Sequence, residues 1–234
     1  MTPGQLIQDG LPYADRLPGV PPVVVITGGQ GTLGQAIAAL FQEAGWKVLA
    51  PGKIELDVRR AGAVDAWFSR LERLDLLINN AGLRRDAPLL KLESGDWDQV
   101  MSVNLRGAFL CSRAAVRLMV RQKHGHIVGI GSHTARRGVA GQSAYGAAKA
   151  GLAALGQSLA AEFGPDNIRV NTVLPGWMPT AFNADLPAAA HEAARQRHLL
   201  GRFNTPLHTA RFLLFLHQQL PHTSGQTFAL DSRP

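Results

Sequence analysis

Cysteine, acidic side chains and long apolar runs are all scarce in this 234-residue chain. The single cysteine, Cys111, excludes an internal disulfide and favours a reducing compartment, so we expect a cytoplasmic protein. No run reaches the about 18 apolar residues that a membrane span needs. Residues 1–22 lack the basic start and apolar core of a secretory signal. Their proline and glycine content predicts an N-terminal arm before a domain over residues 23–234.

The shortage of acidic residues, 17 against 24 lysines and arginines, gives a formal net charge of +7. These basic residues are scattered rather than gathered into a stripe, which argues against a nucleic-acid partner. An anionic cofactor or an acidic partner fits the charge better. The histidines show no spacing with cysteines or carboxylates that is typical of a metal site, so we expect no metal.

Apolar runs of strand length alternate with amphipathic stretches of helix length. Strands are expected at 23–27, 47–50, 54–58, 74–82, 126–132, 168–176 and 226–231, and helices at 32–45, 63–74, 97–125, 143–164 and 206–219. This order predicts a single-domain α/β protein with a Rossmann-type, doubly wound parallel sheet of about seven strands. Only Pro51, Gly52 and Lys53 separate the second and third expected strands, so their connection is shortened.

A glycine-rich stretch, TGGQGTLG from Thr27 to Gly34, joins the first expected strand to the first helix. Glycine permits a tight turn and lets backbone N–H groups approach a pyrophosphate, while the helix N-terminus favours its negative charge. The stretch lacks the Gly-Lys-Ser/Thr ending of a P-loop, which disfavours a kinase or ATPase. We therefore predict dinucleotide binding here.

Three further side chains suggest carbonyl chemistry. Tyr145 and Lys149 stand four residues apart and so share one helical face. A neighbouring ammonium favours the phenolate form and makes the phenol a useful acid–base at neutral pH. Ser132, at the end of an expected strand, is placed to hydrogen-bond a substrate carbonyl.

With the NNAG stretch at 79–82, these residues make the chain resemble the short-chain dehydrogenase/reductase family, most closely its 3-oxoacyl-acyl-carrier-protein reductases. The family's serine lies thirteen residues before its tyrosine, as Ser132 does before Tyr145. The resemblance implies a catalytic tetrad of Asn104, Ser132, Tyr145 and Lys149, with Asn104 kinking its helix. It also implies that the cofactor is lined by Gly28, Gly31, Thr32, Leu33, Gly34, Lys53, Asp57, Val58, Asn80, Ala81, Gly82, Tyr145, Lys149, Pro175, Gly176, Met178 and Thr180.

The chain departs from the family's compact branch in four places. In GIGSHT, His133 follows Ser132, where it is either a substrate contact or a loop histidine. Thr32 occupies the middle glycine position of the glycine loop. Gly52 stands where NAD-preferring members have an acidic residue, and Lys53 follows it, so we predict NADP, with NAD as the alternative. The last strand is followed by LDSRP rather than by an aspartate and two glycines.

The function that these residues imply is hydride transfer between a nicotinamide cofactor and a carbonyl or hydroxyl substrate. The reaction that fits best is NADPH-dependent reduction of a 3-oxoacyl thioester or a similar ketone, with an acyl carrier protein as a candidate partner. The alternative is a non-catalytic nucleotide sensor or scaffold of the same fold. The stretch GQSAYG lacks the final glycine of a nucleophile elbow, which disfavours a hydrolase. The resemblance also implies a homodimer or homotetramer, and residues 180–203 are expected to cover the substrate.

Overall fold

The computed structural model describes residues 19–184 and 187–233. Most of the arm expected over residues 1–22 lies outside this range, so its conformation stays a prediction. None of the described helices is both long and apolar enough to cross a membrane.

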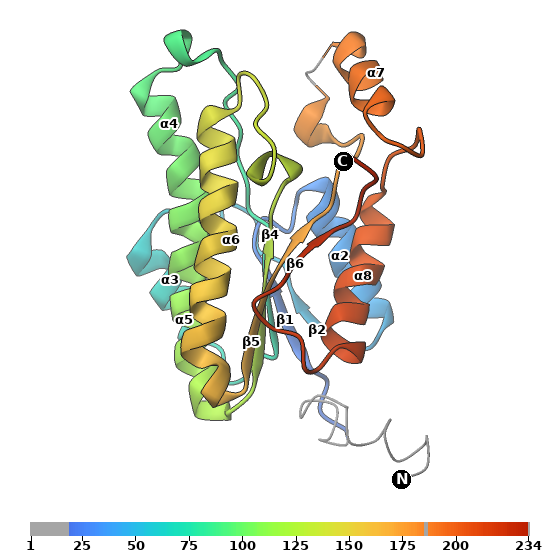
Figure 1. The fold of residues 1–234 in the computed structure, drawn as a ribbon. Helices are drawn as coiled ribbons and strands as arrows, with labels where there is room; N and C mark the ends of the chain where they lie inside the picture. Colours follow the sequence, from blue (N-terminus) through green and yellow to red (C-terminus); the bar gives the residue numbers. More distant parts are fainter. Residues whose placement is uncertain (1–18, 185–186, 234) are drawn as a thin grey trace.

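One parallel sheet of six strands forms the centre of the described chain (Figure 1). In sequence order the strands are β1 (Val23–Ile26), β2 (Lys47–Leu49), β3 (Leu76–Asn79), β4 (Gly125–Ile130), β5 (Ile168–Leu174) and β6 (Thr227–Ala229). Their order across the sheet is β2-β1-β3-β4-β5-β6. The strand order changes direction at β1, because β2 lies on one side of it and β3 on the other. Sheets of this kind bind ligands in the crevice at such a point, here at the carboxyl ends of β1 and β3.

Helices cover both faces of the sheet, which confirms the predicted doubly wound α/β class. On one face lie α3 (Ala61–Phe68), α4 (Ser94–Met101), α5 (Gly107–Gln122) and α6 (Ser143–Phe163), and on the other lie α2 (Thr32–Glu43) and α8 (Pro206–Gln219). A buried apolar cluster fills the space between the sheet and each helical layer. The short helix α7 (Ala188–Gln196) stands above the carboxyl edge of the sheet, away from both layers (Figure 1).

The strand expected at 54–58 is absent, so the sheet has six strands instead of about seven. The prediction of a shortened connection between the second and third strands is therefore wrong, because α3 lies between β2 and β3. Residues 53–59 form turns instead. The Leu56 N–H donates to the Gly52 carbonyl at 2.9 Å, and the Glu55 carboxylate accepts from the Gly52 N–H at 2.8 Å. Ile54 is 96% exposed while Leu56 is buried. Leu56 and Val58, which are buried, therefore anchor a loop that leads into α3.

One helix is also shorter than expected, since α3 ends at Phe68 and not at residue 74. Leu74 is fully buried, and its backbone N–H and carbonyl are both bonded by the side-chain amide of Gln122 at 2.9 and 2.8 Å. Because Gln122 of α5 satisfies the backbone N–H and carbonyl of Leu74, the segment before β3 does not need helical hydrogen bonds.

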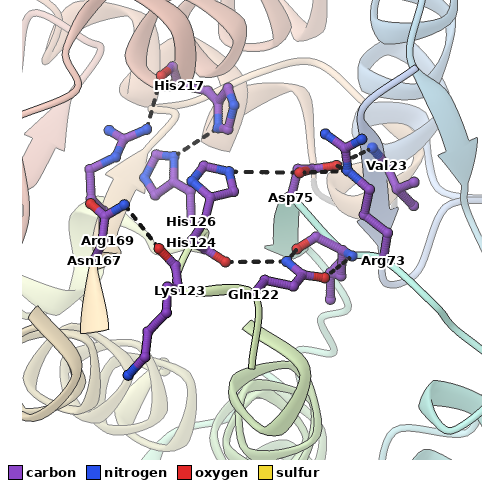
Figure 2. Close-up of polar contacts among 11 residues, drawn as sticks. Val23, Arg73, Asp75, Gln122, Lys123, His124, His126, Asn167, Arg169 and His217 are labelled. Carbon is purple, nitrogen blue, oxygen red and sulfur yellow. Dashed lines mark hydrogen bonds and ion pairs between the residues drawn. The ribbon is translucent and has the colours of Figure 1, made fainter. Parts of the chain in front are cut away.

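A buried polar network lies at the opposite, amino-terminal edge of the sheet (Figure 2). The Asp75 carboxylate accepts hydrogen bonds from the Val23 N–H at 2.7 Å and from Arg73 Nε at 2.8 Å. His124 Nε2 lies 3.7 Å from the other Asp75 oxygen. These contacts join the starts of β1, β3 and β4.

The other half of the network joins α8 to the sheet. His126 Nδ1 lies 3.3 Å from His217 Nδ1, and the Asn171 amide donates to His126 Nε2 at 3.1 Å. Since Asn171 occupies the Nε2 lone pair, the His126 proton sits on Nδ1 and is donated to His217. Arg169 donates to the carbonyl groups of Leu216, His217 and Leu220 and so closes the C-terminal end of α8.

Candidate active site

A single large cleft of about 1000 Å³ opens at the carboxyl edge of the described sheet. It is continuous from the glycine loop after β1, past the ends of β3 and β4, to the segment beneath α7. All the predicted cofactor residues line it: Gly28, Gly31, Thr32, Leu33, Gly34, Lys53, Asp57, Val58, Asn80, Ala81, Gly82, Tyr145, Lys149, Pro175, Gly176, Met178 and Thr180. Ser132 lines it too, whereas Asn104 is buried behind the wall.

The glycine loop is shaped by close backbone contacts. Gly28 has a φ of 63°, and a Cβ there would lie 2.9 Å from Ala81 Cα. A Cβ on Gly34 would lie 2.7 Å from the Gly28 carbonyl oxygen. The first turn of α2 carries no acidic residue, so its N-terminus stays electropositive. This bare, concave backbone fits a pyrophosphate group.

The end of β3 is tied to that loop. The Thr27 hydroxyl oxygen accepts from the backbone N–H groups of Asn80 and Ala81 at 3.1 and 3.0 Å. In return the Asn80 side chain donates to the carbonyl groups of Thr27 and Gly28 at 3.0 and 3.1 Å. The two predicted cofactor segments therefore form one rigid floor of the cleft.

Asn104 occupies a π-helical turn, η3 (Ser102–Arg106), between α4 and α5. Its amide nitrogen donates to the Val100 carbonyl at 2.9 Å and the Leu83 carbonyl at 2.6 Å, while its oxygen accepts from the Leu83 N–H. The predicted long helix is thus interrupted where the sequence placed Asn104. The Asn104 side chain fixes the irregular segment that follows the NNAG stretch, and it acts on the cleft through that segment.

Ser132 and Tyr145 are brought together in the cleft. The Ser132 hydroxyl oxygen accepts from Thr134 Oγ1 at 2.9 Å and from the Thr134 N–H at 3.3 Å, which orients it after β4. Burial raises the pKa of Tyr145 to about 12, and a hydrogen bond with Ser132 partly opposes that rise. The phenol is therefore neutral and carries its proton at neutral pH.

Lys149 lies one turn further along α6 and is 3% exposed. Its Nζ donates to the Ile130 carbonyl at 2.7 Å and lies 5.7 Å from the centroid of the Tyr145 ring. Burial lowers the pKa of Lys149 to about 8. The pKa of Tyr145 is thus raised by burial rather than lowered, contrary to our expectation for a phenol one helical turn from an ammonium.

The adenosine end of the cleft is lined by two cations and one paired carboxylate. Asp57 accepts hydrogen bonds from Arg59 Nε and Nη2 at 2.9 and 2.7 Å, and this contact lowers the pKa of Asp57 to about 2. Lys53 is exposed at the rim. A Cβ on Gly52 would lie 2.3 Å from the Gln30 side chain, so the loop packs directly on the glycine-rich turn.

The segment after β5 turns over the cleft. Gly176 has a φ of 85°, and the Thr180 N–H donates to Asn183 Oδ1 at 3.1 Å at the start of a short 3₁₀ turn, η6 (Ala181–Asn183). The Phe182 ring centroid lies 6.0 Å from that of Tyr145. The expected cover over residues 180–203 thus reaches the predicted catalytic tyrosine.

Several cleft residues were missed by the sequence reasoning: Gln30, Arg59, Thr134, Gln142, Trp177 and Arg233. For Arg59 the sequence did offer a signal, since it stands two residues after Asp57. Residues 180–203 were expected to cover the substrate, but which of their side chains face the cleft depends on how the chain turns after β5.

A dinucleotide floor, a neutral phenol beside an oriented hydroxyl, and a lysine on the same helix together define an oxidoreductase site that acts on a carbonyl or hydroxyl carbon. Comparison with known proteins agrees with this class. The family model described as enoyl-(acyl carrier protein) reductase matches residues 23–232. The 3-oxoacyl-[acyl-carrier-protein] reductase FabG of Thermotoga maritima is 34% identical over 235 residues, covering 89% of this chain and 96% of that protein.

A second relative and a solved structure extend the comparison. The (2S)-[(R)-hydroxy(phenyl)methyl]succinyl-CoA dehydrogenase subunit BbsD of Thauera aromatica is 40% identical over 164 residues, covering 68% of this chain and 66% of that protein. A structure of a putative NAD(P)-dependent gluconate 5-dehydrogenase from Beutenbergia cavernae, with bound NADP, superposes with a TM-score of 0.85 at 28% identity, covering 90% and 95% of the two chains. The chain belongs to the short-chain dehydrogenase/reductase family and is an NAD(P)-dependent oxidoreductase.

Proposed function

We propose that the protein catalyses NADPH-dependent reduction of a 3-oxoacyl thioester or a similar ketone. The observation that carries this proposal is that Ser132, Tyr145 and Lys149 line the same cleft as the glycine loop. A scaffold that only binds nucleotide has no chemical need for a proton donor beside an oriented hydroxyl. No observation favours the non-catalytic alternative.

The residues divide the reaction between them. A reduced nicotinamide, when bound, supplies a hydride to the carbonyl carbon. Ser132 donates a hydrogen bond to the carbonyl oxygen and holds it toward Tyr145. Tyr145 gives its phenolic proton to that oxygen, which its raised pKa permits, since the proton is present at neutral pH. Lys149 holds the ribose next to the nicotinamide, and Asn104 positions the backbone at Leu83.

Charge at the adenosine end supports NADP over NAD. Lys53 and Arg59 line the cleft there, and the one carboxylate that does so, Asp57, is engaged by Arg59. A free carboxylate at this end would favour the two ribose hydroxyls of NAD, whereas cations favour a 2′-phosphate. The structure from Beutenbergia cavernae was solved with NADP bound.

The relatives' names support a thioester substrate, because one acts on 3-oxoacyl-acyl-carrier protein and another on a succinyl-CoA derivative. An acyl carrier protein thus stays a candidate partner. The sequence offers four arginines as candidate contacts for such a carrier, Arg84, Arg85, Arg117 and Arg121. Three of them already have acidic partners, since Arg84 pairs with Asp86, Arg85 with Asp96 and Arg117 with Asp65. A homodimer or homotetramer in the cytoplasm, without a nucleic-acid, membrane or metal partner, stays a prediction.

The test is oxidation of NADPH, followed at 340 nm with acetoacetyl-CoA and repeated with NADH. We expect turnover with NADPH in preference to NADH, and Tyr145→Phe to lower kcat about 1000-fold because it removes the proton donor. Thermal unfolding of the variant checks that it is folded. Turnover by Tyr145→Phe within threefold of the unmodified protein contradicts the proposed role of the phenol.

A further inference from the structure

The last described residues of the chain form part of the cleft wall beside the lid. The backbone N–H of Leu199 donates to the Ser232 carbonyl at 3.1 Å, and the N–H of Leu200 donates to the Ser232 hydroxyl at 3.2 Å. These bonds fasten the terminal segment to the residues that follow α7. As a result Arg233 lines the cleft, in the place where the sequence departs from the family's pair of glycines.

Asp231 holds the Arg233 guanidinium in place. Its Oδ2 accepts from Arg233 Nε at 2.6 Å and lies 2.5 Å from Nη2. The Asp231 side chain is 3% exposed; a Cβ on Gly176 would lie 2.5 Å from it, and His198 Nε2 lies 3.6 Å away. Asp231 is therefore a positioning residue, and it leaves the Nη1 group of Arg233 without a partner among the described residues.

A second cation, Arg197, also lines the cleft and stands two residues before Leu199, whose N–H bonds the terminal segment at Ser232. It is exposed, and no ion pair joins it to any residue in the described ranges. The neighbouring Arg195 differs, because Glu192 binds it through both carboxylate oxygens at 2.7 and 2.8 Å. Positive charge thus remains uncompensated at the lid end, where the cleft extends beyond Ser132 and Tyr145.

The charge of Arg233 also reaches the loop of the catalytic serine. The pKa of His133, which follows Ser132, is lowered by burial first and by the Arg233 charge second. Arg233 and Ser132 also line the same cleft, so a substrate group held by Arg233 shares that cleft with the predicted catalytic serine.

We infer that Arg233, with Arg197, binds an anionic group of the substrate and makes the enzyme specific for carbonyl compounds that carry one. A guanidinium with a free edge suits a carboxylate or a phosphate, and two arginines suit it better than one. The anion has two sources, a carboxylate on the acyl chain or the phosphates of the thioester carrier. This inference rests on the proposed carbonyl reduction.

Two pairs of probes separate these sources. The first pair is ethyl acetoacetate and the monoethyl ester of 3-oxoglutarate, which differ by a carboxylate on the acyl part. The second pair is the pantetheine and the 4′-phosphopantetheine thioesters of acetoacetate, which differ by the phosphate of the carrier. We expect Arg233→Gln to lower kcat/KM about tenfold more for the anionic member of one pair than for its neutral member, mainly through KM. The pair that shows this difference identifies the source.

Two further variants complete the test. Arg233→Lys keeps the charge and should recover part of the loss, and Arg197→Gln, at an exposed position, should reproduce it without affecting folding. Arg195→Gln is the matched control, because this arginine lies on α7 but does not line the cleft. Equal changes in kcat/KM for the neutral and anionic members of both pairs overturn the inference while leaving carbonyl reduction intact. A lack of turnover on all four probes overturns the proposed function, and the inference with it.

Discussion

Lys149 illustrates how a single residue can serve the reaction at the expense of the fold. Its ammonium is buried with one carbonyl acceptor, from Ile130, and without a carboxylate partner among the described contacts. Burial disfavours the charged form, which is why the pKa falls to about 8. With a pKa of about 8, the Lys149 ammonium still carries its charge at neutral pH, although burial makes that charge unfavourable.

This opposition predicts a pH dependence of stability that belongs to one residue. The folded-state pKa lies below the unfolded value of 10.5, so the stability that Lys149 contributes is present above that value and is lost as the pH falls through about 8. We expect the free energy of unfolding of the unmodified protein to rise, relative to Lys149→Met, by about 3 kcal/mol between pH 8 and 10.5. Urea unfolding at a series of pH values measures the difference.

An exposed lysine provides the control for that experiment. Lys91→Met, on the surface of the chain, should follow the pH dependence of the unmodified protein. Tyr145 acts with the opposite sign from about pH 10 upward, but it is present in both proteins, so its effect cancels in the comparison with Lys149→Met. Parallel pH curves for the unmodified protein and Lys149→Met would contradict a depressed lysine pKa.

At the scale of elements, the glycine-rich turn is held between β2 and the start of α2. The Gly29 N–H donates to the Pro51 carbonyl at 3.1 Å, and a Cβ on Gly29 would lie 2.3 Å from the Ala50 carbonyl oxygen. That obstacle is backbone, which cannot move aside as a side chain can. The position of the turn, and hence the dinucleotide floor, depends on the lack of a side chain at residue 29.

We therefore expect Gly29→Ala to weaken nucleotide binding about tenfold or more and to lower the free energy of unfolding by about 1–3 kcal/mol. Fluorescence titration with NADPH and chemical unfolding measure the two effects. Gly62→Ala in α3 is the matched control, because a Cβ there meets nothing within 4 Å. It should leave binding as it is and add about 0.5–1 kcal/mol to stability. Normal NADPH affinity in Gly29→Ala would refute this role of the turn.

The elements also show what can be predicted from the sequence and what cannot. The convergence of the glycine loop, the NNAG stretch and Ser132 was predictable, because parallel strands end at a common edge. The turn at 54–58 was not, since Leu56 and Val58 alternate with polar residues as in a strand. Its shape depends on the local bond between Gly52 and Glu55 and on the packing of Gly52 against the Gln30 side chain. Arg233 was equally hidden, because its approach to the cleft depends on bonds between the terminal segment and the lid.

Across the whole molecule, two polar centres lie at opposite edges of the same sheet. The cleft occupies the carboxyl edge, and the histidine and arginine network of Figure 2 occupies the amino edge. Burial lowers the pKa values of His126 and His217 well below the usual 6.5, and the charge of Arg169 lowers them further. Both imidazoles are therefore neutral in the folded state, and α8 is joined to β4 through their hydrogen bond.

The network predicts that the protein loses stability in mild acid. Both folded pKa values lie below the unfolded value, so their contribution is present above about pH 6.5 and is lost as the pH falls below it, by about 1.4 kcal/mol per pH unit for each histidine. His217→Gln removes one titrating group, while its amide oxygen can accept the His126 proton. We expect this variant to lose stability less steeply between pH 6.5 and 5. The matched control is His208→Gln, an exposed position on the same helix, whose pH curve should follow that of the unmodified protein. If His217→Gln and the unmodified protein lose stability with the same slope, the acid sensitivity arises outside this pair of histidines.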